Sequence, residues 1–386
     1  MPSDPRRPVY LDNHATTALD PSALKAMLPY LRERYGNPSS RSHRSGQMAA
    51  QAMEEARAQV SKLIGSDPSE VFFTSGATEA NNIAIKGLAR ASKRRHLVTL
   101  DIEHRSVLDP LRRLEAEGYV VTRISPGRSG VVDPRAIGAA LRPDTLLVCV
   151  MAANNEIGTV QPVEAIAELA HRRGALVLCD AVQAAGKLDL RRVTAGADLI
   201  TLSAHKLHGP KGVGMLGVRG GRSKIKLIPL FDGGAQEGGL RSGTPNVPGI
   251  VGFGEAARLA SLRLTGDRAR LLWLRKRLWS RLRDQLPAIH LNGDPERRLP
   301  NNLNITIDGV KAAELLKRAV EVEFSGGSAC LTSSPEPSYV LRSIGLTEEQ
   351  RWSSIRLGLA RTLTASDIDR AAAALIRAVR DCRRTV

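Results

Sequence analysis

The stretch LLVCVMAANNEIGTVQPVEAIAELAHRRGALVLCD, residues 146–180, decides the fold class. Its two ends, Leu146–Met151 and Ala175–Cys179, are short apolar runs typical of buried strands. Between them, Pro162–Arg172 has the spacing of an amphipathic helix. Parallel strands need a crossover of a dozen or more residues, which is usually a helix, so this spacing indicates a parallel pair. The stretch therefore predicts an α/β protein.

The same alternation of strand and helix continues on both sides of this stretch. A helix is expected over Ala77–Arg90, directly after an apolar run. Repeated alternation predicts a mostly parallel sheet with helices on both faces. In such a sheet, ligands bind beyond the carboxyl ends of the strands. The further buried strands that we expect are Val71–Thr74, His96–Leu100, Tyr119–Thr122, Leu199–Leu202 and Val213–Val218.

The pattern changes after about residue 260. A long helix follows, then the connection Pro300-Asn301-Asn302, a strand over Leu303–Ile307 and more helix. We therefore expect two domains, since a chain of 386 residues can bury more than one core. The predicted division is a large domain over 16–260 and a small domain formed by 1–15 and 261–386.

Composition excludes several classes of protein. The hydrophobic content of 42% excludes intrinsic disorder, and no apolar run is long enough to span a membrane. Four cysteines in a chain of this length do not form a disulfide framework, so we expect a reduced, cytoplasmic protein. The aromatic content of 3% argues against stacking on single-stranded nucleic acid.

The formal net charge of +17 is spread along the chain. Pairs such as Arg112-Arg113 and Arg191-Arg192 lie far apart in the sequence, whereas a nucleic-acid binder concentrates its charge on one element. In the arginine-rich stretch Arg268–Arg283, leucines recur at helical spacing, so the arginines form the solvent face of a helix. Solvated faces are therefore favoured over a nucleic-acid site, and an acidic protein partner remains an alternative.

Three features together indicate a cofactor site. The small residues of Thr74–Glu79 join a strand to a helix start, where free N–H groups and the helix dipole stabilise a phosphate. An ordinary helix cap is the alternative for this motif alone. Asp180 and Lys206 each end a predicted strand. A lysine that forms a Schiff base and a carboxylate that keeps the pyridinium nitrogen protonated suit pyridoxal 5′-phosphate. Surface charges at strand ends are the alternative for each residue singly.

Short motifs in order along nearly the whole chain carry a resemblance to one family. The chain resembles the cysteine desulfurases of the NifS/IscS type, which have the class V aminotransferase fold. The resemblance implies a pyridoxal-phosphate-dependent transferase of fold type I. The matching motifs are Tyr10–Thr17, Gly36–Ser40, Thr74–Glu79, Glu103-His104, Asn154–Gly158, Asp180–Gln183, Ser203–Lys206, Arg241–Thr244, Gly327–Cys330 and Ser354–Arg356.

The resemblance implies roles for individual residues. Lys206 would bind pyridoxal 5′-phosphate covalently and move the Cα proton of the substrate. Asp180 would pair with the pyridinium nitrogen and Gln183 with the phenolic oxygen, while His104 would stack on the ring and assist proton transfer. The residues implied to hold the phosphate, the last of them from the partner subunit of a homodimer, are Ala77, Thr78, Ser203, His205 and Thr244. The residues implied to bind the substrate carboxylate, the first of which also contacts the cofactor, are Asn155 and Arg356.

Cys330 decides the subfamily. It lies among small residues with two glycines, a composition that predicts an exposed loop over about 325–338 in the small domain. The resemblance implies that its thiolate takes sulfur from L-cysteine as a persulfide, leaving L-alanine, and passes the sulfur to an acceptor protein. Iron–sulfur cluster assembly is the favoured destination, and tRNA thiolation is the alternative. Cys330 would also transiently ligate a nascent iron–sulfur cluster held by the scaffold partner, which is the one metal contact implied.

Other interpretations stay open at this stage. An aminotransferase of the same fold needs no such cysteine, so the loop of Cys330 argues against it. Turnover of selenocysteine is not excluded, since one active site can process both amino acids. A nucleic-acid-binding or scaffold protein without catalysis is opposed by the presence of Lys206, Asp180 and Cys330 together. Cys149 and Cys179 are expected to be inert in the core, and nothing near Cys382 suggests chemistry.

Overall fold

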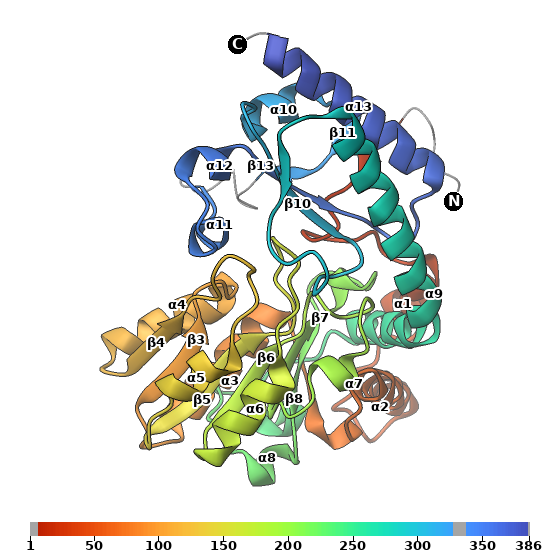
Figure 1. Ribbon diagram of the computed structural model, residues 1–386. Helices are drawn as coiled ribbons and strands as arrows, with labels where there is room; N and C mark the ends of the chain where they lie inside the picture. The colour runs from red at the N-terminus through yellow and green to blue at the C-terminus, as the bar shows by residue number, and fades with distance from the viewer. Residues whose placement is uncertain (1–6, 327–336, 385–386) are drawn as a thin grey trace.

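The computed structural model describes residues 7–326 and 337–384 (Figure 1). A seven-stranded sheet in the order β2-β8-β7-β6-β5-β3-β4 fills its larger part. The five strands from β7 to β4 run parallel, and β8 lies antiparallel between β7 and β2. This arrangement confirms the predicted mostly parallel sheet. The strands are β2 (Val71–Thr74), β3 (His96–Leu100), β4 (Val120–Ile124), β5 (Thr145–Met151), β6 (Leu176–Asp180), β7 (Leu199–Ser203) and β8 (Gly214–Val218).

Helices cover both faces of this sheet, as the sequence predicts. In β5, Leu147 packs in the core beneath α3 and α4, whereas its neighbour Val148 packs in the core on the opposite face, since side chains alternate along a strand. The helices of the first face are α3 (Ala77–Arg90) and α4 (Arg105–Ala116). Those of the opposite face are α2 (Arg44–Ile64), α5 (Pro134–Ala140), α6 (Val163–Arg172), α7 (Leu190–Val193) and the first part of α9.

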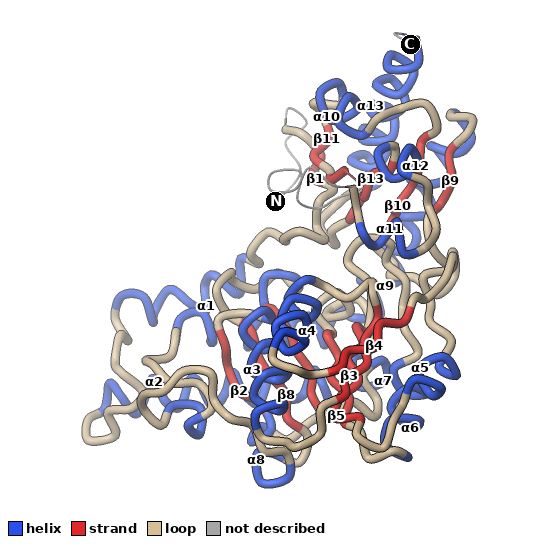
Figure 2. Tube along the Cα trace, turned by 90° about the vertical axis from the view of Figure 1, so that its left-hand side faces the viewer, coloured by secondary structure: helices blue, strands red, loops and turns tan. Residues whose placement is uncertain are grey.

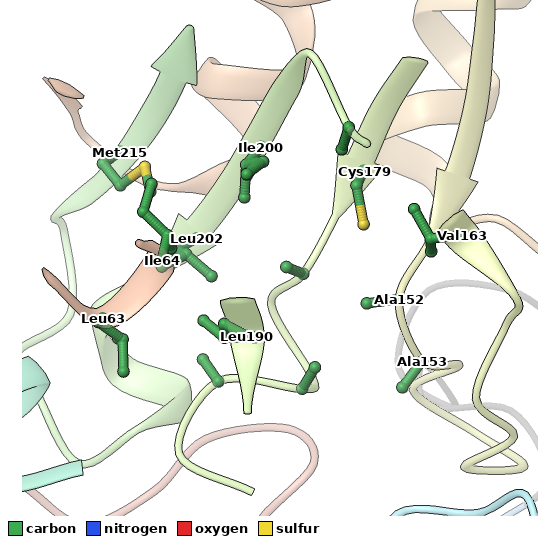
Figure 3. Packing of buried hydrophobic residues seen from close by; sticks show 14 of the residues in the cluster. Leu63, Ile64, Ala152, Ala153, Val163, Cys179, Leu190, Ile200, Leu202 and Met215 are labelled. Atoms are coloured by element: carbon green, nitrogen blue, oxygen red, sulfur yellow. The ribbon is translucent and has the colours of Figure 1, made fainter. Parts of the chain in front are cut away.

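Cys179 lies in the core on this opposite face. Figure 3 shows it among buried apolar side chains that include Val163 and Ile200. Burial raises the pKa of Cys179, and of the equally buried Cys149, well above the ordinary value of a thiol. Both therefore stay protonated and inert, as predicted. Cys382 is also buried, and burial likewise raises its pKa.

The burial predicted for one strand is wrong. The segment expected as a buried strand over Tyr119–Thr122 forms β4, which lies at the edge of the sheet and pairs only with β3. Val120 is consequently 44% exposed. Tyr119, just before β4, is buried, and its hydroxyl donates to the carbonyl of Ala89. An apolar run gives no information on whether a strand has one neighbour or two.

A second, antiparallel sheet in the order β12-β13-β10-β9 forms the other part of the molecule. It has its own apolar core, separate from the two cores of the large sheet. A short parallel pair, β1-β11, packs with this core and joins Val9 to Val322. The strands are β1 (Val9–Tyr10), β9 (Ile289–Leu291), β10 (Asn302–Ile307), β11 (Val322–Glu323), β12 (Ser325–Gly326) and β13 (Ser354–Gly358), and the helices are α10 (Ala312–Arg318), α12 (Glu348–Trp352) and α13 (Ala365–Arg384).

The helix α9 (Val247–Gln285) has 39 residues and belongs to both parts. Val247 to Ala260 pack in a core of the large sheet, whereas Leu271 to Leu282 pack in the core of the small sheet. Figure 2 shows the two parts, with α9 between them. The leucines are buried and most arginines of this stretch are exposed, as predicted, but Arg275 is half-buried and its Nη1 donates to the carbonyl of Leu299. Residue 260, where we place the domain boundary, lies inside this unbroken helix.

The remaining elements complete the surface. Helix α11 lies near the large sheet, because Val340 and Leu341 pack in its core although their segment follows the small sheet in sequence. Within residues 7–326 and 337–384, none of the helices combines the length and apolar character that a membrane span requires. These elements are α1 (Pro21–Arg32), α8 (Gly221–Lys224), α11 (Tyr339–Ser343) and the 3₁₀ turns Pro68–Glu70, Ala204–Lys206 and Gln236–Gly239.

Candidate active site

A pocket of about 590 Å³ lies beyond the carboxyl ends of β2, β3, β5, β6 and β7. This is the edge of the sheet at which a ligand is expected. The segment His14–Thr16 closes one side, and β13 of the small sheet contributes Arg356. The predicted site residues that line the pocket are Ala77, Thr78, His104, Asn155, Asp180, Gln183, Ser203, His205, Lys206 and Arg356.

Lys206 ends the 3₁₀ turn that follows β7, so its side chain starts from the sheet edge. Its Nζ donates to the carbonyls of His14 and Ala15, at 2.6 Å each. Burial, with a smaller contribution from the positive charge of Arg356, lowers the pKa of Lys206 to about 8. A lysine whose pKa lies near neutrality is suited to forming a Schiff base, because more of its amine is unprotonated and the unprotonated amine is the nucleophile.

Asp180 is the last residue of β6, and a buried network fixes its carboxylate. Asn81 donates from Nδ2 to Oδ2 of Asp180 at 3.0 Å, and the N–H of Val182 donates to Oδ1 at 3.1 Å. Asn81 is itself fully buried and accepts a hydrogen bond from Oγ1 of Thr201. These hydrogen bonds fix the orientation of the carboxylate at the pocket that it lines.

His14 and Gln183 form a second buried pair. Nδ1 of His14 lies 3.0 Å from Oε1 of Gln183, while Nε2 of Gln183 donates to the His14 carbonyl at 3.0 Å. Burial is the largest cause that lowers the pKa of His14 well below its ordinary value. The neutral ring therefore donates from Nδ1 to the amide oxygen of Gln183, which fixes the orientation of the amide.

The turn before α3 is suited to an anion. Gly76 precedes the helix at φ +159° and supplies no side-chain cap, so the N–H groups of the first turn remain available to a ligand. Opposite it, Nδ1 of His205 lies 3.1 Å from Oγ1 of Thr16. Burial, then the charge of Lys206, lowers the pKa of His205 to about 4, so the ring is neutral at physiological pH.

His104 caps the first turn of α4. Its Nδ1 accepts from the N–H of Ser106 at 3.1 Å. Desolvation by the surrounding pocket walls lowers the pKa of His104, although its ring is exposed to the pocket. In the neutral ring the proton consequently lies on Nε2, away from the cap, where it can face a ligand.

Arg356 and Asn155 each have a buried polar atom without a partner in the described part of the chain. These atoms are Nε of Arg356 and Oδ1 of Asn155. The rest of the guanidinium is held in place, since Nη2 donates to Asp12 at 2.8 Å and to Ser325 at 3.0 Å. Nη1 donates to the carbonyl of Asn155 at 3.1 Å. A buried polar atom without a partner is costly, which indicates that a ligand pairs with it.

Two predicted site residues are not part of this pocket. Thr244 is exposed and does not line it. Cys330 lies outside the described residues, and the described ends of the exposed loop predicted over about 325–338 differ from that prediction: Ser325–Gly326 is strand β12, and Gly326 and Ser338 are buried. The described chain on the two sides of Cys330 lies beside the pocket: Oγ of Ser325 accepts from the pocket-lining Arg356 at 3.0 Å, and Ser338 donates to the carboxylate of Glu156, the residue after the pocket-lining Asn155.

Comparison with known proteins gives the family. The model of the family "Aminotransferase class-V" matches residues 9–371. The chain belongs to the class-V aminotransferase family. Cysteine desulfurase IscS of Anaeromyxobacter dehalogenans is 47% identical, covering 94% of this chain and 90% of the relative. Cysteine desulfurase of Mus musculus is 46% identical, covering 98% and 82%. A solved NifS-like protein has a TM-score of 0.88 at 35% identity, covering 96% and 98%.

Within the class-V aminotransferase family, this chain is therefore a cysteine desulfurase of the NifS/IscS type, and pyridoxal 5′-phosphate is its cofactor. The pocket fits that group. It combines an amine, a fixed carboxylate, the free N–H groups of a helix start and two unpartnered polar atoms, and each matches one part of a cofactor–amino-acid adduct. The fold of the solved NifS-like protein agrees with the fold type I sheet described above.

Sequence reasoning assigned no role to several residues of this site. Asn81 and Thr201 hold Asp180, His14 holds Gln183, and Asp12 holds Arg356. His14 and Asp12 lie in the family motif Tyr10–Thr17, and this motif was the only feature of the sequence that pointed to them. Asn81 gives a weak signal as an amide on the otherwise apolar face of the helix Ala77–Arg90.

Proposed function

We propose that this enzyme removes sulfur from L-cysteine, releases L-alanine and leaves the sulfur on Cys330 as a persulfide. The observation that carries the proposal is one pocket with Lys206, Asp180 and Arg356 on three of its walls. These three residues supply an amine for the cofactor aldehyde, an anion for the cofactor ring and a cation for an amino-acid carboxylate.

The cofactor would be held by the residues around it. Asp180 would accept from the ring nitrogen and Gln183 would donate to the phenolic oxygen, because each is already fixed by its own hydrogen bonds. The phosphate would meet the N–H groups of Ala77 and Thr78, with Ser203 and His205 opposite. When bound, pyridoxal 5′-phosphate supplies an electron sink for the bonds around the substrate Cα.

The substrate carboxylate would bind at Arg356 and Asn155. Nε of Arg356 is the donor that lacks a partner, and its cation is oriented by Asp12 and Ser325. Because the guanidinium cannot rotate without breaking those contacts, the carboxylate position is fixed relative to Lys206. Lys206 would then take and return the Cα proton, for which its lowered pKa is suited.

The sulfur-transfer step belongs to Cys330. A thiolate attacks the substrate sulfur, an S–S bond forms, and the Cβ–S bond breaks with its electron pair left on the carbon fragment, which is protonated on the way to alanine. Ser325 contacts the pocket-lining Arg356, and Ser338 contacts Glu156, which follows the pocket-lining Asn155, so the described chain on both sides of Cys330 lies beside the pocket. That placement supports Cys330 as the residue that receives the sulfur.

The sulfur would pass from Cys330 to an acceptor protein in the cytoplasm. We propose iron–sulfur cluster assembly as the destination, because a curated relative at 47% identity is named cysteine desulfurase IscS. A brief contact of the persulfide cysteine with iron on the scaffold partner would belong to that transfer. A tRNA-thiolation relay is the second candidate, since a protein-bound persulfide can be collected by any accessible thiol.

Product analysis tests the function. Incubation with L-cysteine should give alanine, and mass spectrometry of the peptide containing Cys330 should show one added sulfur atom that dithiothreitol removes. L-Serine, which has the same carboxylate and amine, serves as the control and should give neither signal. Formation of a keto acid without sulfur on Cys330 would instead indicate an aminotransferase or a lyase.

The enzyme is further proposed to be a homodimer in which Thr244 of one subunit reaches the phosphate of the other. Thr244 is exposed and outside the pocket of its own chain, and Phe231 of the same loop is 60% exposed, as expected of an interface. Ser242 joins the two ends of this loop by donating to the carbonyl of Phe231.

Sedimentation of the cofactor-loaded enzyme should show a dimer. Phe231→Asp should shift it toward a monomer and release cofactor, because a buried charge opposes association. Leu262→Asp, at a residue that is 70% exposed on α9, is the matched control and should leave the dimer intact. A cofactor-loaded, active monomer of the unmodified protein would contradict the shared site.

A further inference from the structure

Lys187 is a buried amine that the reaction described above does not use. It lies in the segment after β6, is only 6% exposed and packs behind the 3₁₀ turn that carries Lys206. Together the two lysines line a small cavity of about 20 Å³, separate from the cofactor pocket and large enough for about one water molecule.

The ammonium of Lys187 is bound by carbonyls. Its Nζ donates to the carbonyl of Lys206 at 3.0 Å and to that of Ala185 at 3.3 Å. Among the described residues it forms no ion pair, and the carboxylate in the same cavity, Asp267, pairs with Arg361 instead. Burying an ammonium without an anion is costly. An apolar side chain would fill this position without that cost. The two hydrogen bonds to carbonyls are therefore what lysine adds at this position.

The surrounding charges make this arrangement more costly still. Burial, then the charge of Lys206, lowers the pKa of Lys187 to about 7. The positive charge of Lys187 in turn contributes to the lowered pKa of three neighbouring rings. The titratable and charged groups that face it are Lys206, His14, His205, His208, Asp267 and Arg361.

The carbonyl that Lys187 binds is the last one of the turn that presents Lys206. Carbonyls at the end of a helical turn lack a partner within the turn. Leu207 and Gly209 both donate to Ala204, which closes the turn but leaves the Lys206 carbonyl outside it. His208 follows at φ +66°, a conformation that a non-glycine residue adopts only at a cost. The backbone after Lys206 thus has an unfavourable conformation at His208, and the hydrogen bond from Lys187 is one of the contacts that hold it.

We propose that Lys187 is a positioning residue for Lys206, binding its carbonyl and fixing the turn so that the cofactor lysine enters the pocket in one orientation. The inference rests on the assignment of Lys206 as the lysine that binds pyridoxal 5′-phosphate. It adds a second lysine that acts through the first and does not touch the cofactor.

The test follows the attachment of the cofactor to apoprotein. Pyridoxal 5′-phosphate is added to cofactor-free enzyme, borohydride stops the reaction at intervals, and peptide mapping counts the adduct on Lys206. In Lys187→Met, which keeps the length of the side chain but no donor, attachment should slow roughly tenfold, as expected for one lost hydrogen bond. Lys187→Gln keeps an N–H donor and should recover a rate within about threefold of the unmodified protein.

Lys276→Met is the matched control, because Lys276 is exposed on α9, and its attachment rate should not change. Thermal unfolding of each apoprotein separates positioning from folding. If Lys187→Met attached cofactor at the unmodified rate, with or without a lower Tm, the inference would be wrong. If that variant did not fold, Lys187→Gln would decide. A kcat near that of the unmodified enzyme would support the inference, because the amide supplies the N–H donor. A kcat loss of roughly tenfold at unchanged KM would contradict it. An adduct on another lysine in the unmodified protein would refute the proposed function instead.

Discussion

Lys206→Ala is expected to abolish covalent attachment of pyridoxal 5′-phosphate and to lower turnover of L-cysteine by about 10⁴-fold or more. The reason is that the variant loses both the amine that binds the cofactor aldehyde and the base that moves the Cα proton. No described side chain of the pocket offers an equivalent amine at the carboxyl end of β7. Borohydride trapping followed by peptide mapping measures the first loss, and alanine release measures the second.

Lys211 provides the discriminating comparison, since it also lines the pocket. Its residue number places it beyond the turn that Lys206 ends, so Lys211→Ala should retain the covalent adduct on Lys206. If the adduct instead persisted in Lys206→Ala and disappeared in Lys211→Ala, the assignment of the two lysines would be reversed.

Cys330→Ser is expected to separate sulfur transfer from binding of the substrate. The variant retains Lys206, Asp180 and Arg356, so L-cysteine should still change the absorbance of the bound cofactor. Release of alanine should fall by about 1000-fold or more, because a serine hydroxyl stays protonated at neutral pH and is a poor nucleophile toward sulfur. Spectra and alanine assays on the same sample give both results.

The other three cysteines supply the control. Cys149, Cys179 and Cys382 are buried, and burial raises the pKa of each, so none offers a thiolate to the substrate. Serine at each of these positions should keep most of the turnover per folded molecule, with any loss traceable to a lower Tm. Near-normal alanine release by Cys330→Ser would exclude the persulfide mechanism and favour elimination on the same cofactor.

Local sequence patterns predicted most of the large sheet. The helix over Ala77–Arg90 has the predicted bounds, and the strand over His96–Leu100 does as well. Apolar periodicity is a local property, so it locates elements without knowledge of their neighbours. The ends of parallel strands share one edge, and for that reason Asp180 and Lys206, 26 residues apart in number, could be expected to face one pocket.

Contacts between distant segments could not be predicted in this way. Asp12 meets Arg356 across 344 residues of chain, and His14 meets Gln183 across 169. The burial of Lys187 could not be predicted from the sequence, because a single lysine near a strand end is ordinarily a surface charge. Only the structure shows that it is buried. The edge position of β4 was missed for the same reason: strand order is a property of the whole sheet.

The unbroken helix α9 also has a mechanical meaning. With 39 residues it is about 58 Å long and acts as a beam, which is fastened to the large sheet along Val247–Ala260 and to the small sheet along Leu271–Leu282. Lys206 is mounted on one of these supports and Arg356 on the other. A helix that passes beside the turn of Lys206 thus couples the support of this lysine mechanically to the support of Arg356.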